Sequence, residues 1–231
     1  LGPGYNNREI EILLKKYNLK YFKKKNLNQY IAQRISEGHL IGWFKGRMEF
    51  THRALGNRSI LADPRRKDTQ NKVNLAVKYR ESFRPFAPAV LDSFSHKIFE
   101  IDKNSKIEFM EKAVFVKKNW RKRIPAVTHV DGTARVQTVS KEFNINFYNL
   151  IQEFYKITNV PVLLNTSFNV AGEPMVDSPK DAINTFISSG IDSLVLGLAL
   201  EGKGPNRLVN ALTGTLTKNL KIPVTIVPEN V

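Results

Sequence analysis

Residues 160–174 read VPVLLNTSFNVAGEP, an apolar run that gives way to small polar side chains and a Gly-Glu-Pro turn. The apolar part predicts a buried strand. The preceding residues 147–157 have the spacing of an amphipathic helix. A second helix is predicted from Ser178 to about residue 188, with Ser178 as its N-cap and a proline at its first position. Residues 193–197 predict another strand, and this alternation is typical of a sheet covered by helices.

The upstream sequence carries the same mixture of elements. Helices are predicted at residues 8–17, 28–37 and 68–79, the last capped by Asp68, and strands at residues 39–44, 87–91 and 113–117. Asp131-Gly132 is the strongest hairpin-turn dipeptide in the chain, so residues 126–130 and 134–139 are predicted to pair as a hairpin. Hairpin neighbours beside helix–strand alternation predict an α/β (α+β) fold with an open mixed sheet.

Composition sets the broad class of the protein. Of its 231 residues 42% are hydrophobic, which suits one large domain with an appendage. We predict a domain at residues 1–200 and a C-terminal extension of unknown role at residues 201–231, where the sequence becomes rich in Thr and Asn. The chain has no cysteine, no apolar run of about 18 residues and no secretory signal. We therefore expect a cytoplasmic protein without a membrane partner.

The net charge is +15, which predicts a polyanionic partner or phosphorylated substrates. The lysines also suit a solvated surface. The arginines are clustered, because seven of the thirteen lie in residues 47–84. Arginine presents a planar fork that matches phosphate and carboxylate, so the clustering favours a defined site for an oxyanion.

Two arginine-rich segments are candidates for that site. Residues 46–66 (GRMEFTHRALGNRSILADPRR) combine arginines with glycines that allow close backbone approach, as in a phosphate cradle. The alternative is a surface loop whose arginines pair with Glu49 and Asp63. Residues 78–91 (KYRESFRPFAPAVL) place Arg80 and Arg84 around Glu81, which suits either an anion site or a structural ion-pair network.

Two further segments carry polar groups in apolar surroundings. Residues 124–139 (IPAVTHVDGTARVQTV) place Arg135 at the start of a strand that should be buried, which is unusual without an anionic partner. His129 and Asp131 offer two metal ligands in principle, but a structural or substrate-contacting histidine is the favoured interpretation. In residues 160–174, Asn165 and its polar neighbours end a strand, where α/β proteins assemble ligand sites, or else form a polar turn.

The common nucleotide and metal motifs are absent. The sequence has no GxxxxGK[ST] loop, no GxGxxG after a strand and no HExxH, and its four histidines are scattered. No metal ligand is expected on this chain.

The four segments, in this order and spacing, resemble the C-terminal domain of the O-carbamoyltransferases of nodulation-factor and antibiotic biosynthesis. The family pattern runs approximately GRMEFGPRALGNRS, KxRExFRPFAP, HVDGTARVQTV and PVLLNTSFNxxGEP, and the match covers roughly residues 1–200. Family members usually have Gly-Pro where this chain has Thr51-His52, and we expect that change to alter the loop beside Arg53.

The resemblance implies a YrdC-like domain, a twisted mixed sheet flanked by helices. It also implies that this domain binds carbamoyl phosphate and ATP and forms carbamoyladenylate, for which Mg²⁺ is expected. An actin-like N-terminal domain, which the start at Leu1 suggests is missing here, would carry metal-binding histidines and pass the carbamoyl group to an acceptor hydroxyl on a small molecule.

Carried over by position, the basic pair of the family falls on Arg47 and Arg53, its strand arginine on Arg135, and its Asn-x-Ser pair on Asn165 and Ser167. These five are the expected catalytic residues. The expected substrate-binding residues are Arg47, Arg53, Arg58, Arg80, Arg84, His129, Arg135, Asn165, Ser167 and Asn169. The alternative function is an RNA-binding or tRNA-modification module, since the basic charge suits RNA and YrdC-like relatives act on tRNA, although no stacking motif of the RRM kind is present.

Overall fold

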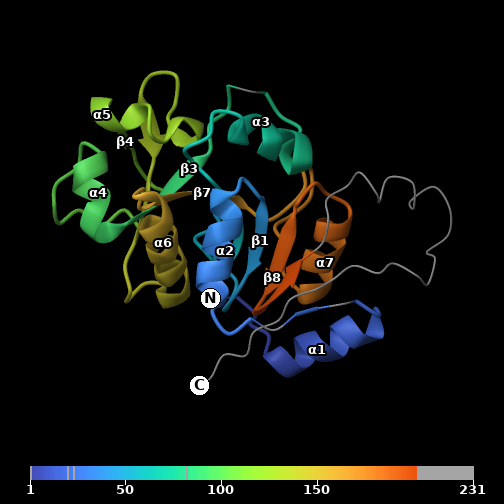
Figure 1. Cartoon of the computed structure of the whole chain (residues 1–231). Coiled ribbons are helices and arrows are strands. Elements are labelled where there is room, and N and C mark those ends of the chain that lie inside the picture. The colour runs from blue at the N-terminus through green and yellow to red at the C-terminus, as the bar shows by residue number, and fades with distance from the viewer. Residues whose placement is uncertain (1, 20, 23, 82, 202–231) are drawn as a thin grey trace.

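A seven-stranded mixed sheet forms the centre of the molecule in the computed structural model, which describes residues 2–19, 21–22, 24–81 and 83–201 (Figure 1). The strand order is β6-β3-β7-β2-β1-β8-β9. These strands are β1 (Ile41–Phe44), β2 (Arg58–Ala62), β3 (Ala87–Leu91), β6 (Gln137–Val139), β7 (Val162–Ser167), β8 (Ser193–Leu196) and β9 (Leu198–Glu201). The predicted α/β fold with a mixed sheet flanked by helices is confirmed. Residues 202–231, nearly all of the predicted extension, lie outside the described residues.

Antiparallel pairing brings three strand ends together. β2 runs antiparallel to both β1 and β7, with Ser59 opposite Ser167, and β3 runs antiparallel to β7, with Ala87 opposite Asn165. The end of β7 therefore lies beside the starts of β2 and β3. Parallel pairs β1–β8 and β3–β6 complete the interior of the sheet.

Helices α2 (Leu27–Ser36) and α6 (Ile145–Thr158) pack side by side in front of the sheet in Figure 1. α6 begins where the Asn144 side chain accepts a hydrogen bond from the Phe147 amide, and it ends at Asn159, whose φ is +54°. Its buried residues join those of α2 and the strands in one continuous core. The predicted helices in these two segments are confirmed.

The remaining helices lie around the sheet. They are α1 (Asn7–Lys16), α3 (Thr69–Val73), α4 (Asp92–Ile98), α5 (Lys118–Arg121) and α7 (Pro179–Ile187). α3 continues directly into η1 (Asn74–Lys78), a π-helical turn that ends at Tyr79 with a φ of +42°. α7 has the predicted cap, with Ser178 and Asp181 forming a reciprocal capping box. No described helix is long and apolar enough to cross a membrane.

The predicted hairpin at residues 126–139 is wrong in its partners. Residues Pro125–Val127 form a 3₁₀ turn (η2), because a proline opens the segment and cannot donate to a strand ladder. The Asp131-Gly132 turn itself is present, with Gly132 at a φ of +83°. The predicted strand 134–139 is split into β5 (Thr133–Arg135), which pairs with β4 (Ala113–Phe115), and β6, which joins the large sheet.

Two other local predictions were incomplete. Residues 46–66 contain β2 in addition to the predicted loop, and α4 was not predicted. Asp68 stands at the start of α3 but makes no capping hydrogen bond; its carboxylate accepts from the Arg66 guanidinium instead.

Candidate functional site

A cavity of about 520 Å³ lies where β7 ends and β3 begins. The antiparallel pairing of these strands positions Asn165 opposite Ala87, so both segments contribute to its wall. It is lined by residues 52–54, Arg80, residues 84–87, Met110, Ala113, His129, Arg135 and residues 165–167. The structure thus brings together parts of all four segments that the sequence singled out.

Four arginines line this cavity: Arg53, Arg80, Arg84 and Arg135. None of the described residues that line it carries a carboxylate. Burial, together with the charges of Arg53 and Arg80, lowers the pKa of Arg135, and burial with the charge of Arg84 lowers the pKa of Arg80. Glu81 opposes the shift in the pKa of Arg80 but does not line the cavity. Four cations without a carboxylate in the lining predict that an anion occupies the cavity.

Two of these arginines have buried donors without a partner. The Nε atoms of Arg80 and Arg135 are buried and make no hydrogen bond within the described residues. A buried N–H group without an acceptor is costly, so each is available to an oxygen of a bound anion. The Arg80 guanidinium also lies 4.5 Å from the centre of the Phe86 ring, which fixes its plane.

His129 adds a titratable group to the same wall. Burial and the charge of Arg135 lower its pKa, and Asp131 opposes the shift. The Thr133 hydroxyl donates to Asp131 at 2.8 Å and lies 2.9 Å from His129 Nδ1. Because the single hydroxyl proton is directed to Asp131, this network fits a neutral imidazole that carries its proton on Nδ1.

Asn165 supplies a hydrogen-bond acceptor. Its Nδ2 donates to the Ala54 carbonyl at 3.0 Å and to Gln137 Oε1 at 2.9 Å, and Gln137 donates to the Leu55 carbonyl. These bonds fix the amide and connect the end of β7 to the Arg53 loop. Asn165 Oδ1 is buried without a partner, so the site offers an acceptor to an N–H group of a ligand.

Lys78 is the residue of this site that the sequence reasoning missed. Its Nζ lies within hydrogen-bond distance of four oxygens, which belong to the carbonyl groups and side chains of Ser167 and Asn169, at 2.6–3.0 Å. Burial, and secondarily the charge of Arg80, lowers the pKa of Lys78 to about 7. A signal was present, because Lys78 opens the segment that contains Arg80 and Arg84.

Asn169 and Ser167 are held by the same lysine. Ser167 donates its hydroxyl hydrogen to Asn169 Oδ1 at 2.6 Å, and Asn169 Nδ2 donates to the Val170 and Glu173 carbonyls. Ser167 lines the cavity, whereas Asn169 lies behind it. Of these two expected binding residues, the structure therefore has only Ser167 in the cavity lining.

Glu49 shapes the loop that carries Arg53. One carboxylate oxygen, Oε1, accepts from the backbone amides of Leu55, Asn57 and Arg58 at 2.7–3.2 Å. Gly56 is required in the same loop, because a Cβ there would stand 2.2 Å from the Phe147 ring. In the place where the family usually has Gly-Pro, Thr51 accepts from the Arg53 amide and His52 lines the cavity.

Arg58 and Arg47 do not line the cavity, in contrast to the expectation that they bind substrate beside Arg53. Arg58 begins β2 and is fully buried, where it donates to the carbonyls of Lys45, Gly46, Asn57 and Pro3. Its guanidinium also lies 3.5 Å from the centre of the Phe44 ring. Arg47 is exposed, and its Nε donates to the Gly2 carbonyl.

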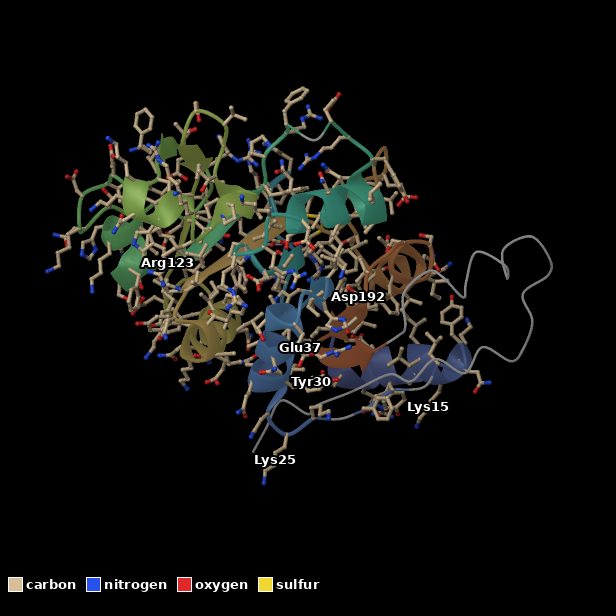
Figure 2. All side chains as sticks on the ribbon, turned by 45° about the horizontal axis from the view of Figure 1, so that its top comes forward. Lys15, Lys25, Tyr30, Glu37, Arg123 and Asp192 are labelled. Carbon is tan, nitrogen blue, oxygen red and sulfur yellow. The ribbon has the colours of Figure 1, made fainter. Side chains whose placement is uncertain are left out.

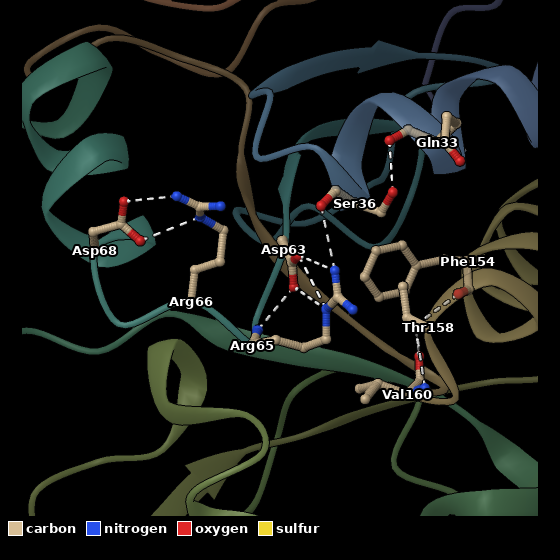
Figure 3. A network of polar contacts seen from close by, with 9 residues as sticks. All are labelled: Gln33, Ser36, Asp63, Arg65, Arg66, Asp68, Phe154, Thr158 and Val160. Atoms are coloured by element: carbon tan, nitrogen blue, oxygen red, sulfur yellow. Dashed lines mark hydrogen bonds and ion pairs between the residues drawn. The ribbon is translucent and has the colours of Figure 1, made fainter.

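The last two arginines of residues 46–66 form structural contacts (Figure 3). Arg65 makes a bidentate ion pair with Asp63, at 2.7 Å for the shorter contact, and donates to the Ser36 carbonyl. Arg66 pairs with Asp68 at 3.2 Å. The interpretation of the segment as an ion-paired loop therefore holds for these two arginines, and the anion-site interpretation remains for Arg53.

The described residues contain no group of three or more His, Asp or Glu side chains that could hold a metal ion. The cavity likewise offers no carboxylate among the residues described for its lining, so it does not suit a protein-held Mg²⁺ ion.

Comparison with known proteins gives relatives of similar sequence. A nodulation protein NolNO of Sinorhizobium fredii is 50% identical over 167 residues, which cover 72% of this chain and 25% of the relative. A nodulation protein NolO of Bradyrhizobium diazoefficiens is 43% identical over 211 residues, 90% of this chain and 38% of the relative. A 3'-hydroxymethylcephem-O-carbamoyltransferase of Amycolatopsis lactamdurans is 36% identical over 163 residues, 71% and 30% respectively. The chain thus spans well under half the length of these relatives.

The fold also matches a solved structure. The crystal structure of full-length HypF in a phosphate- and nucleotide-bound form superposes with a TM-score of 0.50 at 14% identity, covering 74% of this chain and 21% of that one. The family model described as carbamoyltransferase C-terminus matches residues 32–203. This match and the relatives confirm the resemblance stated from the four segments, and the chain belongs to the carbamoyltransferase C-terminus family.

Proposed function

We propose that this chain is the C-terminal part of an ATP-dependent O-carbamoyltransferase. Its cavity would bind carbamoyl phosphate and ATP, form carbamoyladenylate, and supply it for transfer to the hydroxyl of a small-molecule acceptor. The observation that carries the proposal is the cavity that combines four arginines with the unpartnered oxygen of Asn165. The first feature suits phosphate, and the second suits the N–H₂ group of a carbamoyl moiety.

The charges explain why one cavity would need so many cations. Carbamoyl phosphate is a dianion and ATP carries about four negative charges, so binding both requires several positive groups and Mg²⁺. Mg²⁺ would be held by the phosphates of ATP, since the described lining has no carboxylate to hold it. Lys78 would add a charge next to Ser167, whose hydroxyl oxygen it contacts at 3.0 Å.

The proposed reaction needs no nucleophile from the protein. Adenylation displaces pyrophosphate from the α-phosphorus of ATP, and arginine forks stabilise the charge that develops. Water must first remove the phosphate group from carbamoyl phosphate. An oxygen of the resulting carbamate then bonds to the α-phosphorus. Atom balance therefore requires one phosphate and one pyrophosphate for each carbamoyladenylate formed.

Exposed apolar residues that neighbour the lining residues in the sequence, here called the rim of the cavity, support a role for the rest of a longer protein. Val130 and Phe50 are 95% and 91% exposed, and Phe83 is also largely exposed. Each lies within two positions of a residue that lines the cavity. Apolar side chains around a polar cavity are typical of a surface that another domain covers. In our proposal the N-terminal domain packs on this rim and receives the carbamoyl group.

The test is to incubate the chain with ATP, carbamoyl phosphate and Mg²⁺ and to measure phosphate and pyrophosphate release. We expect both products in equal amounts, with no pyrophosphate when carbamoyl phosphate is omitted. Arg135→Ala should abolish the release, and Arg66→Ala, which alters an arginine outside the cavity, should not. If titration calorimetry detects binding of neither substrate to the folded chain, the proposal fails.

A further inference from the structure

One end of the molecule carries a block of positive charge that the cavity does not use. Residues 12–36 contain seven lysines and arginines and no Asp or Glu, and six of the seven are lysines within residues 15–25. Elsewhere basic side chains are paired with acidic ones, as in Lys156–Glu153 and Arg66–Asp68. A second basic run, residues 117–123, differs because Lys117, Arg121 and Arg123 donate to backbone carbonyls there. Residues 15–25 also contain three aromatic residues. We call residues 12–25 the basic–aromatic segment.

Part of the described segment packs on the core, and the rest of its charged and apolar side chains are exposed. α1 is anchored by Ile10 and Leu14, which are buried in the core. Its other face exposes Ile12, at 59%, beside the exposed Lys15 and Lys16, because residues three and four apart share one face of a helix.

After the helix, two aromatic side chains, Tyr17 and Phe22, are 42% and 46% exposed. The lysines Lys24 and Lys25 are exposed in the same stretch. Exposed apolar side chains therefore alternate with exposed lysines along this stretch of the chain.

The segment lies away from the cavity. α1 is at the opposite end of the molecule from β4 and α5 in Figure 1, and β4 begins with Ala113, which lines the cavity. Figure 2 shows Lys15 and Lys25 directed outward at that same end. A partner bound there would leave the cavity open.

We propose that the basic–aromatic segment docks the protein on the surface of an anionic lipid bilayer. Clustered lysines attract anionic headgroups, and exposed aliphatic and aromatic side chains enter the interface between headgroups and acyl chains. This inference is independent of the proposed function, and it departs from the sequence-based expectation of no membrane partner.

A lipid surface fits better than single-stranded nucleic acid. Nucleic acid binding of that kind needs aromatic faces on which bases stack. Tyr17 and Phe22 offer two such faces, but Ile12, the most exposed apolar residue of the segment, offers none, whereas all three can enter a lipid interface.

Co-sedimentation of the full chain with vesicles tests the proposal. Vesicles of phosphatidylcholine with about 30% phosphatidylglycerol should bind the chain at about 0.1 M salt, where charges interact over about 10 Å. Vesicles of phosphatidylcholine alone should bind it far more weakly. Equal binding to both, or binding to neither, overturns the proposal, and so does tighter binding of an oligouridine than of the anionic vesicles.

Removing the lysines should abolish the binding. Each lysine near an anionic surface contributes about fivefold, so four substitutions should weaken binding several hundredfold. The test variant is Lys15→Ala/Lys16→Ala/Lys24→Ala/Lys25→Ala. The matched control removes the same charge from exposed lysines elsewhere, Lys103→Ala/Lys106→Ala/Lys118→Ala/Lys122→Ala, and should bind nearly as the parent does. An equal loss in both variants would show a response to net charge only and would overturn the proposal.

Vesicle binding at high salt measures the contribution of the apolar side chains. At about 0.5 M salt the attraction between charges is screened, and the binding that remains depends on apolar insertion. Ile12→Ser/Tyr17→Ser/Phe22→Ser should remove this remaining binding. Since these side chains are exposed, the variant should keep the far-ultraviolet circular dichroism of the parent. Unchanged binding at high salt contradicts insertion.

Discussion

The buried Arg58 and the half-buried Arg80 and Arg135 differ in what surrounds their guanidinium groups. Arg58 donates to four backbone carbonyls and stacks on Phe44. Arg80 and Arg135 make no hydrogen bond or ion pair with a described residue, and they face other cations in the cavity. An unpartnered Nε does not by itself identify a binding arginine, since Arg58 has one as well. Neighbouring like charges, together with the lack of carbonyl partners, distinguish Arg80 and Arg135.

The comparison predicts opposite costs for the two groups. Arg58 stabilises the fold because the backbone around β1 and β2 needs its donors. Arg80 and Arg135 repel each other, so the empty cavity is a cost to folding that a bound anion would offset.

The largest effect is expected for Arg58→Ala. The variant leaves four carbonyl groups without this donor and a cavity beside Phe44, so the free energy of unfolding should fall by about 3 kcal/mol or more. Urea denaturation followed by circular dichroism measures this fall. A loss below about 1 kcal/mol would contradict the structural role of Arg58.

Arg135→Ala should instead weaken ligand binding. Carbamoyl phosphate should lose about 1.5–3 kcal/mol of binding free energy, as for other hydrogen bonds to charged groups, while the free energy of unfolding stays unchanged or rises. Titration calorimetry and urea denaturation on the same preparation separate the two quantities. Arg66→Ala serves as the control that should change neither, and a loss of stability in Arg135→Ala without weaker binding would refute the distinction.

Lys78 gives a prediction on pH. Since the pKa of Lys78 is lowered to about 7, the amine is mostly neutral at pH 8. A bound phosphate favours the charged amine and raises its pKa, so binding at pH 8 should take up a proton, and affinity should fall up to about tenfold per pH unit above 7. Calorimetry at pH 8 in buffers of different ionisation enthalpy counts the proton. Lys78→Met should abolish the uptake, and an uptake that persists in this variant excludes Lys78 as its source.

The same shift affects stability in the opposite direction. The unfolded chain, with a lysine pKa near 10.5, holds more protons than the folded chain between pH 7 and 10.5. The contribution of Lys78 to the free energy of unfolding therefore increases as pH rises through that window. In Lys78→Met this increase should be missing from a series of urea titrations across the window.

The smallest effect is expected for a residue outside both groups. Ser178→Ala removes the N-cap of α7 and should cost about 1 kcal/mol of stability. Affinity for carbamoyl phosphate should not change. A weaker affinity in this variant would show that the cavity responds to general loss of stability, which would weaken the interpretation of Arg135→Ala.

Local signals in the sequence were sufficient for much of the fold. The α7 cap, the strand Ala87–Leu91 and the helices at residues 27–36 and 145–158 follow from periodicity and capping residues. The split of residues 134–139 into β5 and β6 does not, because the two halves pair with β4 and β3, which are distant in sequence. Strand pairing of this kind is not encoded in any single segment.

The site was predictable as a set of segments more than as a set of side chains. Arg53 and Arg58 are five residues apart in one segment, yet only Arg53 lines the cavity. The pairing of β2 with β1 and β7 decides which of them is enclosed. Lys78 was not predicted as a site residue, because its oxygen partners come from residues 167–169, which are distant in sequence.

The π-helical turn at Asn74–Lys78 makes the number of residues in this helix matter as much as their identity. A π turn is equivalent to an α-helix that has gained one residue. Deleting one residue from it would restore the ordinary turn and redistribute the side chains within the turn, so that Lys78 would lose its present placement against Ser167 and Asn169. Single-residue gaps should therefore be excluded from this stretch in functional relatives, even where substitutions are tolerated at the exposed Leu75.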